Sequence, residues 1–104
     1  MEYQTEGSMS LFVVRHEHTA DRCPAKDRTM APVLLTHLSQ ENARRFGINI
    51  KSEAVIDGAH TLYLTLEAKD EESVQQFMRP FAQAGSLEVL SASPCEVVVG
   101  RGAC

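Results

Sequence analysis

Hydrophobic and polar positions change their spacing several times along this chain, and each change marks an element. Segment 11–18, LFVVRHEH, begins with four apolar residues in a row, which is typical of a central strand buried on both faces. In segment 60–68, HTLYLTLEA, leucines alternate with other residues at the period of a strand that turns one face to a core. Segment 48–57 has a similar strand pattern, and Asp57-Gly58 indicates a turn, so these two strands form a hairpin.

Two stretches follow the spacing of helices instead. Pro32 can open a helix because the first position needs no backbone N–H, and three leucines follow on one face. Ser39 resembles an N-cap and Gly47 a helix end, so this region is one bent helix or two short ones. Asp70 caps a second helix with an acidic first turn, and Gly85 ends it.

The remaining segments complete an alternating order. Residues 19–30 lack periodicity and predict a long loop, whereas 86–90 predicts a strand. Segment 95–99, CEVVV, predicts an extension of that strand or a short fifth one, because valine favours strands. The order βαββαβ predicts an α+β, ferredoxin-like fold, with two helices on one face of a four-stranded antiparallel sheet. The leucines of 60–68 should then point towards the helices.

Composition narrows the class of protein. A chain of 104 residues with 43% hydrophobic content predicts one globular domain, residues 9–104, after a polar leader at 1–8. A net charge of −4 argues against binding to nucleic acid, which requires a basic surface. The longest apolar run is far too short for a membrane span, and no secretory signal precedes it. These features predict a cytoplasmic protein.

The chain resembles the dimeric α/β-barrel superfamily in three local features. These are LFVVRHEH as the first strand, HTLYLTLEA as the third, and FMRPFAQAGSLEVL as the second helix running into the fourth strand. The resemblance is nearest to small members of that superfamily, a neighbourhood that includes a nickel-binding ferredoxin-like branch. It implies a homodimer in which two sheets pack face to face. It implies no particular activity, because the superfamily also contains cofactor-free monooxygenases, haem-handling enzymes and isomerases.

The end of the first strand carries the strongest chemical signal. His16 and His18 are two residues apart and therefore share one face of a strand, and Cys23 follows in the loop. Two imidazoles with a thiolate suit Zn, Ni or Cu, so we consider His16, His18 and Cys23 as ligands of a divalent transition metal. The other interpretation is a structural pair of histidines at the rim of the sheet.

Topology suggests which other side chains can join these histidines. If the first strand runs parallel to the third, His60 lies at the opposite edge of the sheet, roughly 20 Å away. His60 is then excluded, whereas Glu67, Glu88 and His37 come within reach. Three cysteines cannot all pair within one chain, and a reducing cytoplasm disfavours disulfides.

A second hypothesis is a site for a small organic molecule between two packed sheets. Arg15, Glu17, Tyr63 and Glu67 should converge on the sheet face away from the helices, in a cavity with apolar walls. Such a cavity would suit a small-molecule ligand or a cofactor-free enzyme. Against this, Arg15 and Glu67 could simply neutralise each other. A dimeric structural module without chemistry is a third possibility, so whether the protein is an enzyme stays open.

Overall fold

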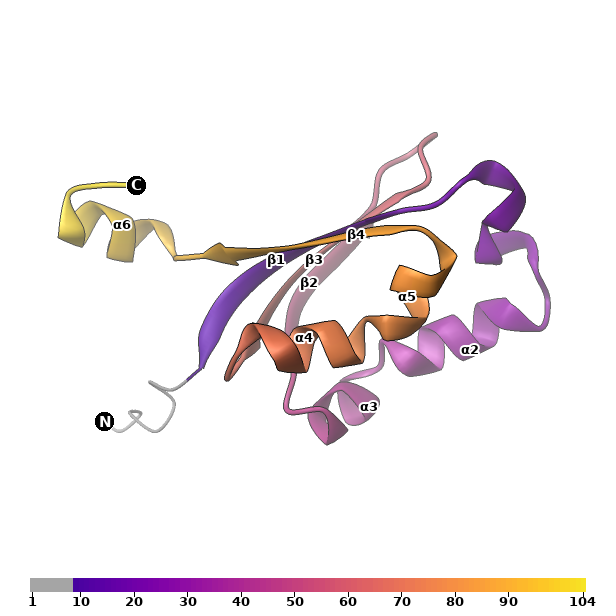
Figure 1. Cartoon of the computed structure of the whole chain (residues 1–104), viewed down its shortest axis with the longest axis horizontal. Coiled ribbons are helices and arrows are strands. Elements are labelled where there is room, and N and C mark those ends of the chain that lie inside the picture. Colours follow the sequence, from indigo (N-terminus) through magenta and orange to yellow (C-terminus); the bar gives the residue numbers. More distant parts are fainter. Residues whose placement is uncertain (1–8) are drawn as a thin grey trace.

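The computed structural model describes residues 9–104, and the expected leader at 1–8 lies outside them. The fold is α+β: a four-stranded antiparallel sheet of order β2-β3-β1-β4 carries most of the helices on one face (Figure 1). This arrangement is compatible with a ferredoxin-like fold. The strands are β1 (Ser10–Glu17), β2 (Asn49–Val55), β3 (Thr61–Ala68) and β4 (Ser86–Ala92). The helices are α2 (Met30–His37), α3 (Gln40–Arg45), α4 (Glu71–Phe77), α5 (Arg79–Ala84) and α6 (Cys95–Arg101), with 3-10 turns η1 (Ala20–Arg22) and η2 (Pro24–Lys26).

The core lies between the sheet and helices α3, α4 and α5. The three leucines of β3 point into it as predicted, and they pack with alternate residues of β1 and with the apolar side of α4. Fully buried members include Val14, Leu64, Leu66, Val74 and Phe77. Because alternate residues of a strand face opposite ways, the remaining positions of β1 and β3 form a second face, which no helix layer within residues 9–104 covers. We call it the open face.

Helix boundaries follow the capping residues of the sequence. The Ser39 hydroxyl accepts a hydrogen bond from the Asn42 N–H at 3.2 Å, which separates α2 from α3 and confirms two short helices. The Asp70 carboxylate accepts one from the Ser73 N–H at 2.9 Å and begins α4. Pro80 lies in the first turn of α5, where the missing N–H costs no helical hydrogen bond.

Gly85 brings the start of β4 unusually close to the end of β1. A Cβ at this position would lie 2.1 Å from the Glu17 carbonyl oxygen and 3.0 Å from the His18 Cα. The φ angle of Gly85 is 177°, an extended value that any residue adopts, so the constraint is steric. Only glycine therefore allows β4 to pair with β1 up to Glu17 and Ser86.

Two predictions about the fold are wrong. Strand β1 runs antiparallel to β3, not parallel, with Glu17 opposite Thr61. Segment 95–99 is neither a fifth strand nor an extension of β4, because Pro94 ends the extended chain and α6 follows. The predicted loop at 19–30 holds the two 3-10 turns, and its last residue already begins α2.

Helix α6 differs from the other helices in its position. It projects beyond the end of the sheet, away from the turns at residues 20–26 (Figure 1). Val97 and Val99 on this helix are 47% and 79% exposed. Across residues 9–104, no helix is long and apolar enough to cross a membrane.

Candidate metal centre

The antiparallel pairing of β1 and β3 brings two histidines together at one end of the sheet. His18 follows the last residue of β1, and His60 precedes the first residue of β3. The His18 N–H donates to the His60 carbonyl oxygen at 3.0 Å, which extends the ladder by one bond. The centroids of the two imidazole rings are 5.3 Å apart. Register alone therefore makes these two side chains neighbours.

The loop after β1 adds a thiol to this pair. Cys23 lies between η1 and η2, where two short turns reverse the chain, and its side chain is half-buried. One potential ligand atom from each of His18, Cys23 and His60 lies within 4.8 Å of the others. Donor atoms around a tetrahedral metal are about 3.3–3.8 Å apart at bond lengths of 2.0–2.3 Å, so small side-chain rotations would close the site.

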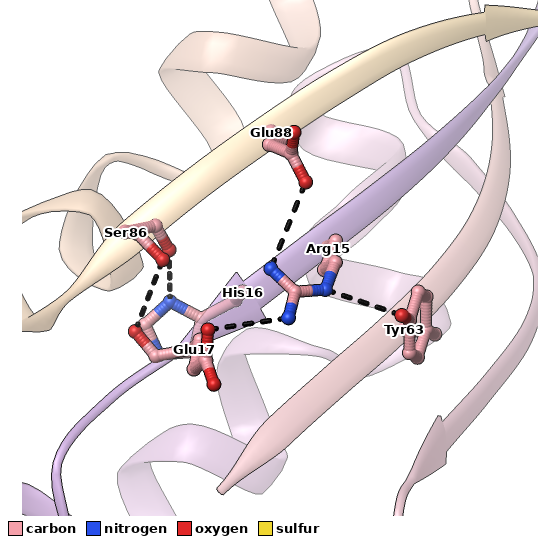
Figure 2. Close-up of polar contacts among 6 residues, drawn as sticks. All are labelled: Arg15, His16, Glu17, Tyr63, Ser86 and Glu88. Carbon is pink, nitrogen blue, oxygen red and sulfur yellow. Dashed lines mark hydrogen bonds and ion pairs between the residues drawn. The ribbon is translucent and has the colours of Figure 1, made fainter.

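A chain of hydrogen bonds fixes the protonation of His18. The Ser86 carbonyl oxygen can only accept, so His16 Nδ1 carries a proton and donates to it at 3.0 Å (Figure 2). In a neutral ring the other nitrogen, Nε2, then accepts from His18 Nδ1 at 3.1 Å. His18 Nε2 is left with a free lone pair. It is buried and has no hydrogen-bond partner among residues 9–104.

Burial also favours the neutral form of both rings. Desolvation lowers the pKa of His16 below its ordinary value, and the neighbouring His18 lowers it further, although the hydrogen bond to Ser86 opposes both effects. Desolvation also lowers the pKa of His18, with a smaller contribution from His60. Neutral imidazole is also the form of histidine that can bind a metal.

The cluster differs in membership from the predicted ligand set. Of the predicted ligands, His18 and Cys23 belong to the cluster. His16 does not, and its Nε2 instead forms a hydrogen bond with His18 Nδ1. His60 belongs to it, so its exclusion was wrong, because that exclusion depended on a parallel first and third strand. Glu67 lies opposite Leu11 at the other end of the sheet and cannot reach the histidines.

Two other predicted neighbours also lie elsewhere. His37 stacks on Phe77, with ring centroids 4.7 Å apart, and its Nε2 donates to the Phe77 carbonyl oxygen at 2.6 Å. Glu88 pairs with Arg15 on the open face, whereas His16 is buried on the helix side of β1. Neither side chain belongs to the cluster.

Arg15 is the centre of a separate polar group on the open face (Figure 2). Its Nε donates to the Tyr63 hydroxyl at 3.1 Å, and its terminal nitrogens lie 3.2 Å from the Glu17 carboxylate and 3.7 Å from that of Glu88. Three of the four residues predicted to converge thus do so. The fourth, Glu67, instead accepts a hydrogen bond from Asn49 at 3.0 Å, so it does not neutralise Arg15.

The open face carries apolar side chains around this polar group. Leu90 is 50% exposed and Tyr63 is 37% exposed, and Leu11 and Val13 lie beside them on β1. The small-molecule site predicted between two packed sheets needs a second chain and stays a prediction.

Comparisons with family models, with curated proteins and with solved structures found no match for this chain.

Proposed function

We propose that this protein binds a divalent transition-metal ion through His18, Cys23 and His60. One observation carries the proposal: the hydrogen-bond chain from Ser86 through His16 leaves a buried, unpartnered lone pair on His18, a residue that has a ring nitrogen within 4.8 Å of donor atoms of Cys23 and His60. A buried polar atom without a partner costs about 1–3 kcal/mol, and a bound ion would satisfy it. His16 acts as a positioning residue that sets the tautomer of His18.

The donor set favours certain metals. Two imidazoles and one thiolate suit Zn²⁺, Ni²⁺ or copper, whereas Mg²⁺ and Ca²⁺ prefer oxygen donors. Of these, Zn²⁺ accepts a tetrahedral mixture of nitrogen and sulfur most readily. Nothing in the cluster resembles the carboxylate cage of a hard cation, since no Asp or Glu belongs to this group in residues 9–104.

A Co²⁺ titration of the reduced protein tests the proposal, because Co²⁺ substitutes for Zn²⁺ and a thiolate ligand gives an intense charge-transfer band. We expect saturable binding with that band. His18→Ala or His60→Ala should weaken binding by at least about tenfold, and Cys23→Ser should reduce the band. His37→Gln and Cys104→Ser are matched controls outside the cluster and should bind as the unaltered chain does. Equal affinity in His18→Ala would contradict the proposal.

We also propose a homodimer of the dimeric α/β-barrel type, formed by the open faces of two sheets. The apolar residues of the open face support this, because exposed apolar patches on a sheet favour association. Sedimentation at micromolar concentration should give twice the chain mass of 11.5 kDa. Leu90→Asp, on the open face, should dissociate the dimer, whereas Leu35→Asp, 70% exposed on α2, should not. A monomeric unaltered chain would contradict this proposal.

A further inference from the structure

A surface cavity lies where the end of α2 meets the junction of α4 and α5, on the helix side of the sheet (Figure 1). Its volume is about 440 Å³. Sites for small organic molecules have volumes of about 300–1,000 Å³. We call it the α4–α5 cavity, and its lining consists of His37, Phe46, Gln76, Arg79, Pro80 and Gln83. Because it lies away from the open face, the proposed homodimer would leave it accessible.

The two aromatic side chains of the lining are held in place by the break between α4 and α5. In a continuous helix the Phe77 carbonyl oxygen would accept a hydrogen bond from the Phe81 N–H. The Phe81 N–H instead donates to the Met78 carbonyl oxygen at 2.9 Å, which leaves the Phe77 carbonyl oxygen to His37 Nε2 at 2.6 Å. His37 also stacks on Phe77, and Phe46 contacts His37 edge-on with ring centroids 5.9 Å apart. Both rings are therefore positioned before any ligand binds.

The α4–α5 segment supplies the polar part of the lining. Gln76, Arg79 and Gln83 are spaced by three and four residues, which places side chains on one side of a helix. Among the described residues that line the cavity, Arg79 carries the only permanent charge, and none is acidic. Every ion pair within residues 9–104 involves Arg15, so no acidic side chain of that part of the chain neutralises Arg79.

More positive charge adjoins the cavity. Arg44 and Arg45 form the last turn of α3 and directly precede Phe46 in the chain. The chain as a whole has a net charge of −4, so this local excess of cations has the opposite sign to the rest of the protein. A local potential of this sign attracts anions and raises their concentration at the site. The cavity is thus suited to a ligand that combines negative charge with an apolar or aromatic body.

We propose that the α4–α5 cavity binds a small aromatic carboxylate. The Arg79 guanidinium would donate paired hydrogen bonds to the carboxylate, because its planar fork matches the two oxygens. The side-chain amides of Gln76 and Gln83 can donate further hydrogen bonds. The ring of the ligand would pack against Phe46 and His37, since aromatic pairs favour offset or edge-on contacts. This binding function goes beyond metal binding and requires neither the metal centre nor the homodimer.

An NMR titration of the isotope-labelled, metal-free protein with benzoate tests the proposal. We expect saturable shifts at Arg79 and at the side-chain amides of Gln76 and Gln83. The dissociation constant should lie in the millimolar range, because benzoate has only about nine non-hydrogen atoms and most of the lining residues are exposed. Shifts that grow without saturation, or that centre on Arg15 instead, would overturn the inference.

Two related compounds separate the contributions of charge and ring. Benzamide has nearly the same shape as benzoate but no charge, and cyclohexanecarboxylate has the charge but no aromatic ring. Each should bind at least about threefold more weakly than benzoate, because each loses one of the two contacts. Equal affinity for benzamide and benzoate would overturn the inference, since Arg79 would then contribute nothing to recognition.

Variants of Arg79 test the site directly. Arg79→Gln should weaken benzoate binding by about three- to tenfold, and Arg79→Lys should weaken it less because the charge is kept. Arg28→Gln is the matched control, because Arg28 is exposed in the turn before α2 and does not line the cavity. It should bind benzoate as the unaltered chain does. Arg79 is itself exposed, so Arg79→Gln should stay folded, which the same spectra report. Unchanged affinity in Arg79→Gln would overturn the inference.

Discussion

Replacing Gly85 by alanine should disturb the fold and the proposed metal centre together. Gly85 contacts the backbone where β1 ends, and a Cβ there would lie 2.1 Å from the Glu17 carbonyl oxygen. Ordinary contacts between a methyl carbon and an oxygen are more than about 3 Å, so the start of β4 must move by roughly 1 Å. Interiors resist such shifts because their packing is dense.

The displacement determines the size of the effect. Moving Ser86 by roughly 1 Å would lengthen its 3.0 Å hydrogen bond with His16 beyond the usual limit of about 3.2 Å. Overpacking of this kind reduces the free energy of unfolding by about 1–3 kcal/mol. Because His16 orients His18, metal affinity should also fall, by about 10- to 100-fold, the usual cost of losing a partner of a metal ligand.

Urea denaturation of the metal-free protein and a Co²⁺ titration measure the two effects of Gly85→Ala. Gly100→Ala is the matched control, because a Cβ at Gly100 meets no atom within 4 Å. Alanine has a higher helix propensity than glycine. This control should therefore keep the metal affinity, and its free energy of unfolding should rise by up to about 1 kcal/mol. Unchanged stability and affinity in Gly85→Ala would refute the steric argument.

Three further predictions concern the core, the caps and pH. Leu64→Ala should lower the free energy of unfolding by about 2–5 kcal/mol, because Leu64 is completely buried, and a near-neutral result in urea denaturation would contradict the assignment of faces. Ser39→Ala should cost about 1 kcal/mol through loss of the α3 cap, measured in the same way, and Ser39→Asp should restore most of it. Burial lowers the pKa of His16 and of His18, so the unfolded chain binds more protons than the folded one below about pH 6.5. The stability of the metal-free protein should therefore fall as the pH drops from 8 to 5.5, and this fall should be smaller in His18→Asn; a pH-independent stability would refute it.

The arrangement of strands was predictable where the sequence pattern has a single structural meaning. The alternating leucines of β3 fix which face meets the helices, and Ser39 and Asp70 mark helix starts because their side chains accept from backbone N–H groups. The strand predicted for segment 95–99 was wrong. It was predicted because three valines favour a strand. Their preference is overridden where Pro94 ends β4 and the chain leaves the sheet, so that no neighbouring strand is present to pair with.

The candidate metal centre was predictable in part. His18 and Cys23 are close in the sequence, and a short loop brings them together without knowledge of the fold. His60 is distant in the sequence, and its inclusion depends on the relative direction of β1 and β3. Because neighbouring strands of this sheet are antiparallel, the residue after one strand meets the residue before the other. With β1 and β3 taken as antiparallel, the sequence alone would have predicted that His60 lies next to His18.

His16 connects the core of the sheet with the proposed metal centre. This side chain is 3% exposed and contacts Phe81 edge-on, in a position where the preceding alternate residues of β1 are apolar. A histidine there costs free energy unless both ring nitrogens have partners, and Ser86 and His18 supply them. Both nitrogens of His16 are therefore satisfied, and the unsatisfied atom of the two rings is His18 Nε2, which has no hydrogen-bond partner in residues 9–104. An ion at that nitrogen would complete the chain, so metal binding and the stability of this end of the sheet should rise together.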